Sequence, residues 1–210
     1  MPFIKKYVKR LAFSHAYRSN MTVAGYTTNL NYTDQETSVD LNGNVIEQKQ
    51  ILTASIMEQF SPLLGIDMTL DNDIKAKFEF KKDRTISLGL ANNQITEIKG
   101  TEITFGTGYT WKNLQLPIKF EDKLLEANDL VTSLDVSIRD NKTIIRKIVE
   151  NQNQPTAGQK IVSIKFTARY DLTDKLSARL YFDRVVNTPF ISTSFPTANT
   201  SAGVALRFQL

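Results

Sequence analysis

The chain has 210 residues, of which 41% are hydrophobic and 23% are charged, and its formal net charge is +4. This balance excludes a disordered chain, and a mean hydropathy of −0.27 without any long apolar run excludes a bundle of membrane-spanning helices. Basic and acidic residues alternate along the chain, which disfavours a nucleic-acid partner. No cysteine is present, so disulfides and thiolate metal sites are excluded.

The first ten residues contain lysines and an arginine that interrupt every apolar stretch, so they do not form a secretory signal peptide. The rest of the chain has the pattern of an exported barrel. Together these features predict that the export signal lies upstream. Residues 1–210 are then a single, incomplete domain, the C-terminal segment of a larger outer-membrane β-barrel.

Segments with a hydrophobic period of two residues follow one another along the whole chain, which predicts an all-β antiparallel fold without significant helix. Polar tips at 71–73 and 82–84 are interpreted as hairpin turns, and long polar loops are expected at 33–49, 112–129 and 142–160. About ten strands result: 12–26, 50–60, 63–70, 74–80, 86–90, 101–111, 130–141, 161–172, 176–183 and 201–210.

Many of these strands reach the 9 to 11 residues that a tilted transmembrane strand needs, whereas strands of soluble sheets average about 5 to 6 residues. The clearest hairpin, 161–183, separates apolar from charged side chains on alternate positions. Lipid-facing candidates are Val162, Ile164, Phe166, Leu180 and Phe182, and lumen-facing candidates are Lys165, Arg169, Arg179, Asp183 and Arg139. Candidates for an aromatic girdle are Tyr109, Trp111, Tyr170 and Phe182.

The last predicted strand has a polar residue, then a glycine, then large apolar residues at alternate positions: Ser201, Gly203, Leu206 and Phe208. This spacing resembles the closing-strand signal by which the barrel assembly machinery recognises bacterial outer-membrane proteins. The usual signal ends on the aromatic residue, whereas this chain continues through Gln209 and Leu210. An ordinary amphipathic edge strand of a soluble sheet is the alternative interpretation.

Several longer blocks, 26–30, 61–67, 136–147, 154–160, 180–190 and 194–200, resemble in order the C-terminal region of the SprA/Sov family, the outer-membrane translocons of the type IX secretion system. The resemblance implies a single-chain barrel of exceptional strand number in the bacterial outer membrane. Its lumen would export folded cargo proteins to the cell surface, including gliding-motility adhesins. The implied partners are cargo proteins, outer-membrane lipid, accessory subunits of the secretion system and the barrel assembly machinery, with no nucleic acid.

Two other classes of protein fit the alternation: a small self-contained outer-membrane barrel with a structural or adhesive role, and a soluble lipocalin-like ligand-binding barrel. An enzyme is not expected, because His15 is the only histidine and neither a nucleophile elbow nor a phosphate-binding loop occurs. The acidic tip at 71–73 lacks the glycine and glutamate of a calcium loop. No catalytic residue, metal ligand or cofactor is therefore predicted.

Overall fold

The computed structural model describes residues 7–33, 38–115, 117, 119–120, 123–124, 127–173, 175–191 and 194–209. Its secondary-structure elements are all β-strands, and 79% of the residues belong to them. No helix among the described residues is long and apolar enough to cross a membrane. The first six residues and Leu210 lie outside the described residues.

One nine-stranded antiparallel sheet contains nearly all of the ordered chain, which confirms the all-β class. A separate ribbon, β6 (Lys119–Phe120) with β7 (Lys123–Leu124), lies within the predicted loop 112–129. The strands of the sheet are β1 (Val8–Ser14), β2 (Tyr17–Thr28), β3 (Lys49–Leu70), β4 (Lys75–Gly89), β5 (Gln94–Leu114), β8 (Asn128–Lys147), β9 (Gln152–Thr173), β10 (Leu176–Pro189) and β11 (Thr197–Phe208).

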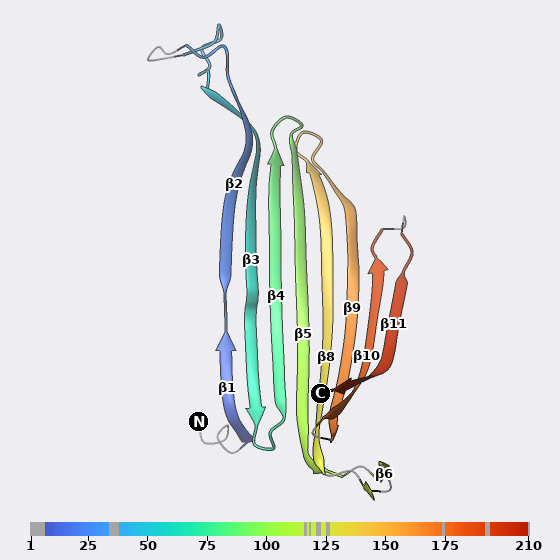
Figure 1. Cartoon of the computed structure of the whole chain (residues 1–210). Coiled ribbons are helices and arrows are strands. Elements are labelled where there is room, and N and C mark those ends of the chain that lie inside the picture. Colours follow the sequence, from blue (N-terminus) through green and yellow to red (C-terminus); the bar gives the residue numbers. More distant parts are fainter. Residues whose placement is uncertain are drawn as a thin grey trace.

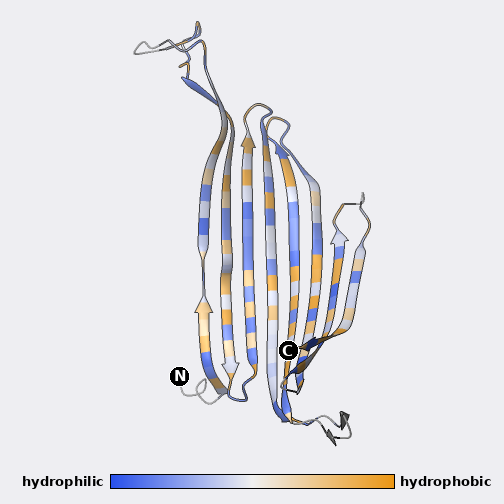
Figure 2. Cartoon of the chain, in the orientation of Figure 1, coloured by the Kyte–Doolittle hydropathy of each residue, from blue (hydrophilic) through white to orange (hydrophobic). Residues whose placement is uncertain are grey.

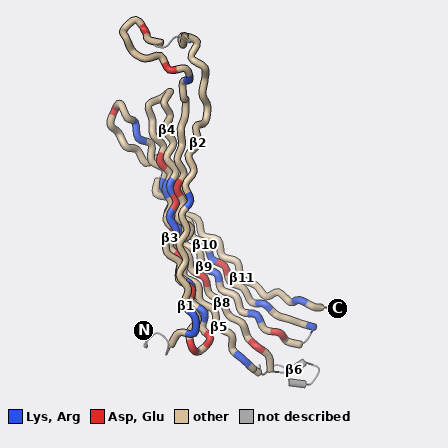
Figure 3. The backbone as a smooth tube through the Cα atoms, turned by 90° about the vertical axis from the view of Figure 1, so that its left-hand side faces the viewer, with Lys and Arg blue, Asp and Glu red and all other residues tan. Residues whose placement is uncertain are grey.

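The sheet is an open meander in a single layer. From β3 to β11 each strand pairs with its neighbour along the chain, and β1 and β2 both pair with β3 at one edge while β11 forms the other edge (Figure 1). The two edges do not meet, so the sheet is not closed. Viewed from its side the chain is one thin, twisted layer (Figure 3).

Several strands are longer than the sequence predicts. The expected turn at 82–84 does not exist, because β4 continues through Lys82, Asp83 and Arg84 as far as Gly89. The charged residues stay in the strand because partners on neighbouring strands pair with them. Arg84 contacts Glu97 at 2.9 Å, and Asp83 lies 4.0 Å from Arg139.

The expected loop 142–160 is also wrong. β8 runs to Lys147 and β9 starts at Gln152, so only residues 148–151 form a turn. The hairpin turns at 71–74, 90–93 and 148–151 each contain a residue in the left-handed conformation, with φ of 65° at Asp73 and 50° at Asn93 and Asn151. Aspartate and asparagine tolerate this conformation better than other side chains, so they fix where each hairpin reverses.

The predicted strand 12–26 is interrupted, whereas the predicted strands 50–60 and 63–70 are joined. β1 and β2 lie end to end along the continuous β3, with a register irregularity between Phe60 and Leu64. At the interruption, the amide of Ala16 donates to the carbonyl of Pro62 at 2.9 Å, and the amide of Ser61 donates to the carbonyl of Ala16 at 3.1 Å. These hydrogen bonds hold the two edge strands in line.

The sheet has no hydrophobic core of the usual kind. Among the described residues Tyr170 is the only hydrophobic side chain that is buried. The extensive contacts between strands all link neighbours within the sheet or within the β6–β7 ribbon. The fold therefore depends on backbone ladders and on side-chain contacts within each face.

We expect Gly158→Ala to destabilise the sheet, because a Cβ there would lie 2.8 Å from the Phe190 ring and 2.9 Å from the Asn141 carbonyl oxygen. Overpacking of this kind costs about 1 to 3 kcal/mol. Gly108→Ala is the matched control, since its Cβ would lie 3.4 Å from the Thr132 carbonyl oxygen. Urea unfolding followed by circular dichroism measures both. Equal losses for the two variants would contradict the packing of Phe190 over Gly158.

Candidate functional site

Alternation places the side chains of the sheet on two sides with different chemistry, and hydrophobic and hydrophilic residues alternate along the strands (Figure 2). We call the side that carries Phe105 the apolar face and the other side the polar face. Cross-strand register brings Phe80, Ile103, Ile138 and Val162 into one row on the apolar face. The adjacent row toward the 71–74 turn consists of Phe78, Phe105, Val136 and Ile164 on the same four strands.

The apolar band is the charge-free part of the apolar face. Its only polar side chains besides the tyrosines and the tryptophan are Thr107 and Thr132. The band consists of Leu11, Phe13, Leu64, Ile66, Met68, Leu70, Ala76, Phe78, Phe80, Ile103, Phe105, Thr107, Tyr109, Trp111, Leu130, Thr132, Leu134, Val136, Ile138, Val162, Ile164, Phe166, Ala168, Tyr170, Ala178, Leu180, Phe182, Ala202, Val204, Leu206 and Phe208.

The apolar band is large and uncovered. Ile103 is 46% exposed, Phe105 47% and Leu206 66%. From about 3.4 Å per residue and about 4.8 Å between strands, the band measures roughly 27 Å along the strands and roughly 34 Å across them. The largest apolar patch on a typical soluble monomer is only about 300 to 600 Å². A surface of this size indicates contact with a nonaqueous environment or with a partner.

A group of charged residues, the charged belt, ends the apolar band on the same face. On β3, β4, β5, β8, β9 and β10 the first charged residue above the band is Glu58, Lys82, Lys99, Asp140, Lys160 and Arg184, respectively. Arg84, Glu97, Lys142 and Arg146 complete the belt just above them. Charged residues likewise gather across the strands at mid-length in Figure 3.

Glu97 is the most enclosed residue of the charged belt. It is 4% exposed and lies between two arginines, 2.9 Å from Arg84 and 2.6 Å from Arg146. Arg84 also lies 4.0 Å from Glu58, so one chain of ion pairs crosses from β3 to β8. The belt is thus part of the sheet structure and not a set of independent surface charges.

Aromatic rings lie at both margins of the apolar band. At the lower margin Tyr109 and Trp111 contact edge to face with centroids 4.8 Å apart, and the hydroxyl of Tyr170 donates to the Leu114 carbonyl at 2.7 Å. At the upper margin Tyr17 and Phe60 lie 4.6 Å apart, with Phe60 paired to Lys82. On β10, Phe182 is the last residue of the apolar band before Arg184 on the same face, and it lies opposite Phe166 of β9; its place in an aromatic girdle stays a prediction.

The polar face carries a network of ion pairs at the level of the apolar band. Glu79 contacts Lys77 at 3.0 Å and Lys81 at 3.1 Å, and Glu102 lies 4.0 Å from Lys81 and 3.7 Å from Arg139. Because basic and acidic residues pair along and across β4, β5 and β8, this part of the face is hydrophilic without a dominant sign of charge.

Glycines of β5 make room for these charged side chains. A Cβ at Gly100 would lie 2.6 Å from a carboxylate oxygen of Asp83, and one at Gly106 would lie 2.7 Å from Asp135. The acidic side chains of β4 and β8 therefore lie across β5, where any larger residue would displace them. The small residues of β5 are explained by this close approach.

The register supports the predicted separation of the candidate residues into two sets. Val162, Ile164, Phe166, Leu180 and Phe182 all lie on the apolar face, and Lys165, Arg169, Arg179, Asp183 and Arg139 all lie on the polar face. In the strand register Lys165 lies opposite Asp135 of β8 and Asp183 of β10, and Arg169 lies opposite Arg179. Whether these faces contact lipid and a lumen stays a prediction.

The predicted closing strand is β11, an edge strand. Leu206 and Phe208 lie on the apolar face, and they are 66% and 62% exposed. Ser201 and Gly203 lie on the polar face, where the ring of Tyr181 covers Gly203, since a Cβ there would lie 2.7 Å from its hydroxyl. The glycine of the motif thus has a packing role, and the recognition role stays a prediction.

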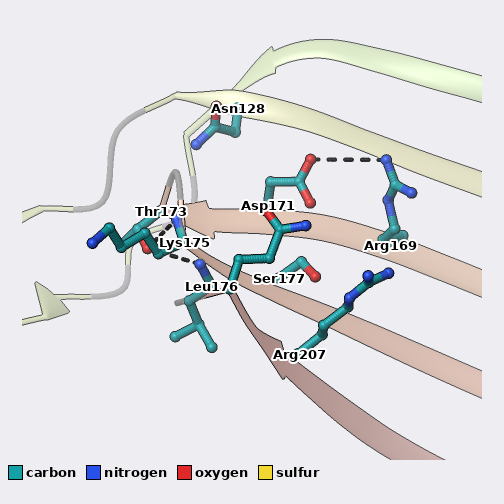
Figure 4. Close-up of a pocket in the computed structure, with 9 residues that line it drawn as sticks. Asn128, Arg169, Asp171, Thr173, Lys175, Leu176, Ser177 and Arg207 are labelled. Atoms are coloured by element: carbon teal, nitrogen blue, oxygen red, sulfur yellow. Dashed lines mark hydrogen bonds and ion pairs between the residues drawn. The ribbon is translucent and has the colours of Figure 1, made fainter.

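An open hollow of about 380 Å³ lies where β9, β10 and β11 end (Figure 4). Arg169, Lys175 and Arg207 line it together with Asp171, which lies 3.9 Å from Arg169. The turn beside it is held by the Thr173 hydroxyl, which accepts from the amide of Leu176 at 3.1 Å. The described residues contain no group of three or more side chains suited to a metal ion.

Asp73 holds the lower ends of three strands together. Its carboxylate lies 2.9 Å from the Nζ of Lys9 in β1, and 3.5 Å from the Nζ of Lys112 near the end of β5. The hydrogen bond from Lys9 lowers the pKa of Asp73, and the same bond raises the pKa of Lys9. The acidic tip at 71–73 therefore serves as a turn, as the sequence predicts.

Sequence reasoning missed the charged belt. The sequence predicts a turn at Lys82 and Arg84 and a loop from Lys142 to Lys160, because charges that interrupt an apolar alternation usually indicate the end of a strand. The available signal was the even spacing of Lys82 and Arg84 from Phe78 and Phe80, because this spacing keeps the two basic side chains on the apolar face. Glu97 and Arg146 lay outside the strands that we predicted.

Comparison with models of protein families and with curated proteins finds no match for this chain.

Under the lipid-facing assignment, Phe166→Arg should destabilise the protein by about 2 to 4 kcal/mol, because Phe166 lies in the middle row of the apolar band. Ser163→Arg is the control, since it places the same side chain on the polar face of the same strand, between Ser137 and Val185. Urea unfolding in lipid vesicles, followed by circular dichroism, compares the two. A larger loss for Ser163→Arg would show that the polar face is the water-excluded side.

Proposed function

We propose that this chain is part of the wall of a large transmembrane β-barrel in the bacterial outer membrane, with the apolar face toward lipid and the polar face toward a water-filled lumen. The proposal depends on one observation: the apolar band is uncovered, lies on one face of the sheet only, and ends at the charged belt. On β5, β8 and β9 the band measures roughly 27 Å along the strands, which a tilt of about 35–45° reduces to about 19–22 Å, somewhat less than the band of about 25 Å that outer-membrane barrels present to lipid.

The open sheet favours an arc of a wide barrel over a small complete one. The eight strands from β1 to β11 in the sheet order leave both edges unpaired, whereas a self-contained barrel of this size pairs its first and last strands. Unpaired backbone groups are costly in lipid, so both edges need neighbouring strands there. A lipocalin-like barrel encloses its apolar face, and the exposed apolar band counts against that alternative.

The more specific proposal is a protein-conducting channel, the translocon of a type IX secretion system. Support comes from the sequence blocks that resemble the SprA/Sov family. The polar face adds to it, because its paired charges and its glycines form a hydrophilic surface. Cargo proteins pass such a wall without chemistry, so the wall contributes only a continuous hydrogen-bonded cylinder and a wet inner surface.

Trp111 tests the membrane assignment, because it is the only tryptophan and lies in the apolar band. After refolding into neutral phosphatidylcholine vesicles, we expect its fluorescence to shift to shorter wavelength and to be quenched by lipids brominated on their acyl chains. A water-soluble quencher should have little effect. Fluorescence that responds only to the water-soluble quencher would contradict the proposed membrane wall.

The translocon assignment is tested by site-specific crosslinking in the bacterium, for which the absence of native cysteines is convenient. We expect a cysteine at Ser163, on the polar face, to crosslink to secreted cargo proteins in transit. A cysteine at Ile164, the next residue on the apolar face, should not crosslink to cargo. Normal secretion without cargo crosslinks at Ser163 would contradict a cargo-conducting lumen on this side, even where the Trp111 experiment supports a membrane wall.

A further inference from the structure

We propose that the charged belt binds the anionic headgroups of membrane lipids whose acyl chains cover the apolar band. The inference rests on the proposed membrane wall and adds a lipid preference to it. The occupant to which we commit is a lipid with a negatively charged headgroup, held by lysine and arginine side chains.

The position of the belt fits a headgroup. On β4 the apolar residues Phe78 and Phe80 are followed on the same face by Lys82, two residues further along the strand. On β9 the apolar residues Val162 and Ile164 are adjoined in the same way by Lys160. A lipid that lies with its acyl chains along the band therefore brings its headgroup to the level of these lysines.

The charge of the belt selects the sign of the headgroup. Its acidic residues already have basic partners within the belt: Glu97 contacts Arg84 and Arg146, Glu58 lies 4.0 Å from Arg84, and Asp140 lies 3.8 Å from Lys142. In the described part of the chain no carboxylate lies within ion-pair distance of Lys82, Lys99, Lys160 or Arg184. The belt thus has seven basic residues and three acidic ones, an excess of positive charge that external anions can neutralise.

The polar face differs at the level of the apolar band. There Lys77 and Lys81 share Glu79, and Arg139 approaches both Glu102 and Asp83. Cations of the polar face are therefore largely paired within the sheet where β4, β5 and β8 meet. The unpaired lysines of the belt are on the face that the proposed function turns toward lipid, which is where an anionic headgroup is available.

The test compares two triple variants that lose the same net charge. The belt variant carries Lys82→Gln, Lys99→Gln and Lys160→Gln, and the control variant carries Lys165→Gln, Arg179→Gln and Arg207→Gln on the polar face. Each full-length chain is titrated with phosphatidylcholine vesicles, with or without phosphatidylglycerol, and Trp111 fluorescence measures partition. The conservative variant with arginine at all three belt positions tests for retained function of the cations.

We expect phosphatidylglycerol to increase partition of the unaltered chain by roughly tenfold or more, since each cation near an anionic surface contributes about fivefold. The belt variant should lose most of this increase, while the control and the arginine variant should keep it. Equal losses in the belt and control variants, or no loss in either, would overturn the inference while binding to neutral vesicles still supports the membrane wall. Absence of binding to every vesicle would overturn both.

Discussion

The period of two residues along a strand is the constraint on which this structure depends. In a protein of two or more layers, each sheet has a face that the neighbouring layer covers and keeps from solvent. The described part of this chain has only one layer, so every side chain belongs to one of two open surfaces. Apolar residues such as Phe105 and Phe166 and charged residues such as Glu102 and Lys165 can coexist only because alternation separates them.

The charges within the strands follow from the same constraint. Arg84 and Asp83 are neighbours in sequence, yet they belong to different ion-pair networks, because one joins Glu97 on the apolar face and the other approaches Arg139 on the polar face. Each network connects side chains of several strands, whereas a backbone hydrogen-bond ladder connects only two adjacent strands. Paired charges of this kind contribute modest stability in water, but they fix register, since a slip of one residue would put each charge on the wrong face.

The fold class, the hairpin around residues 173–175 and the face of each candidate residue were predictable from the sequence, because alternation is a local property. Strand ends were not. The segments 82–84 and 142–160 are polar, and polarity alone does not tell a turn from a strand whose charges have partners on other strands. The interruption at Ala16 was equally hidden, because it depends on hydrogen bonds to Pro62 and Ser61, which are distant in sequence. The charged belt requires the register of six strands, which no single segment contains.

The meander has a consequence for how the protein acquires its structure. Because from β3 onward each strand of the nine-stranded sheet pairs with the next strand of that sheet, and four of these six connections have at most four residues, most docking steps close a short loop and have a small entropic cost. Growth by successive hairpins is therefore favourable from any starting pair of adjacent strands. The slow event in such a pathway is the pairing of strands that are remote in sequence. In this sheet, such pairing would involve the free edge of β11 and the free edge formed by β1 and β2.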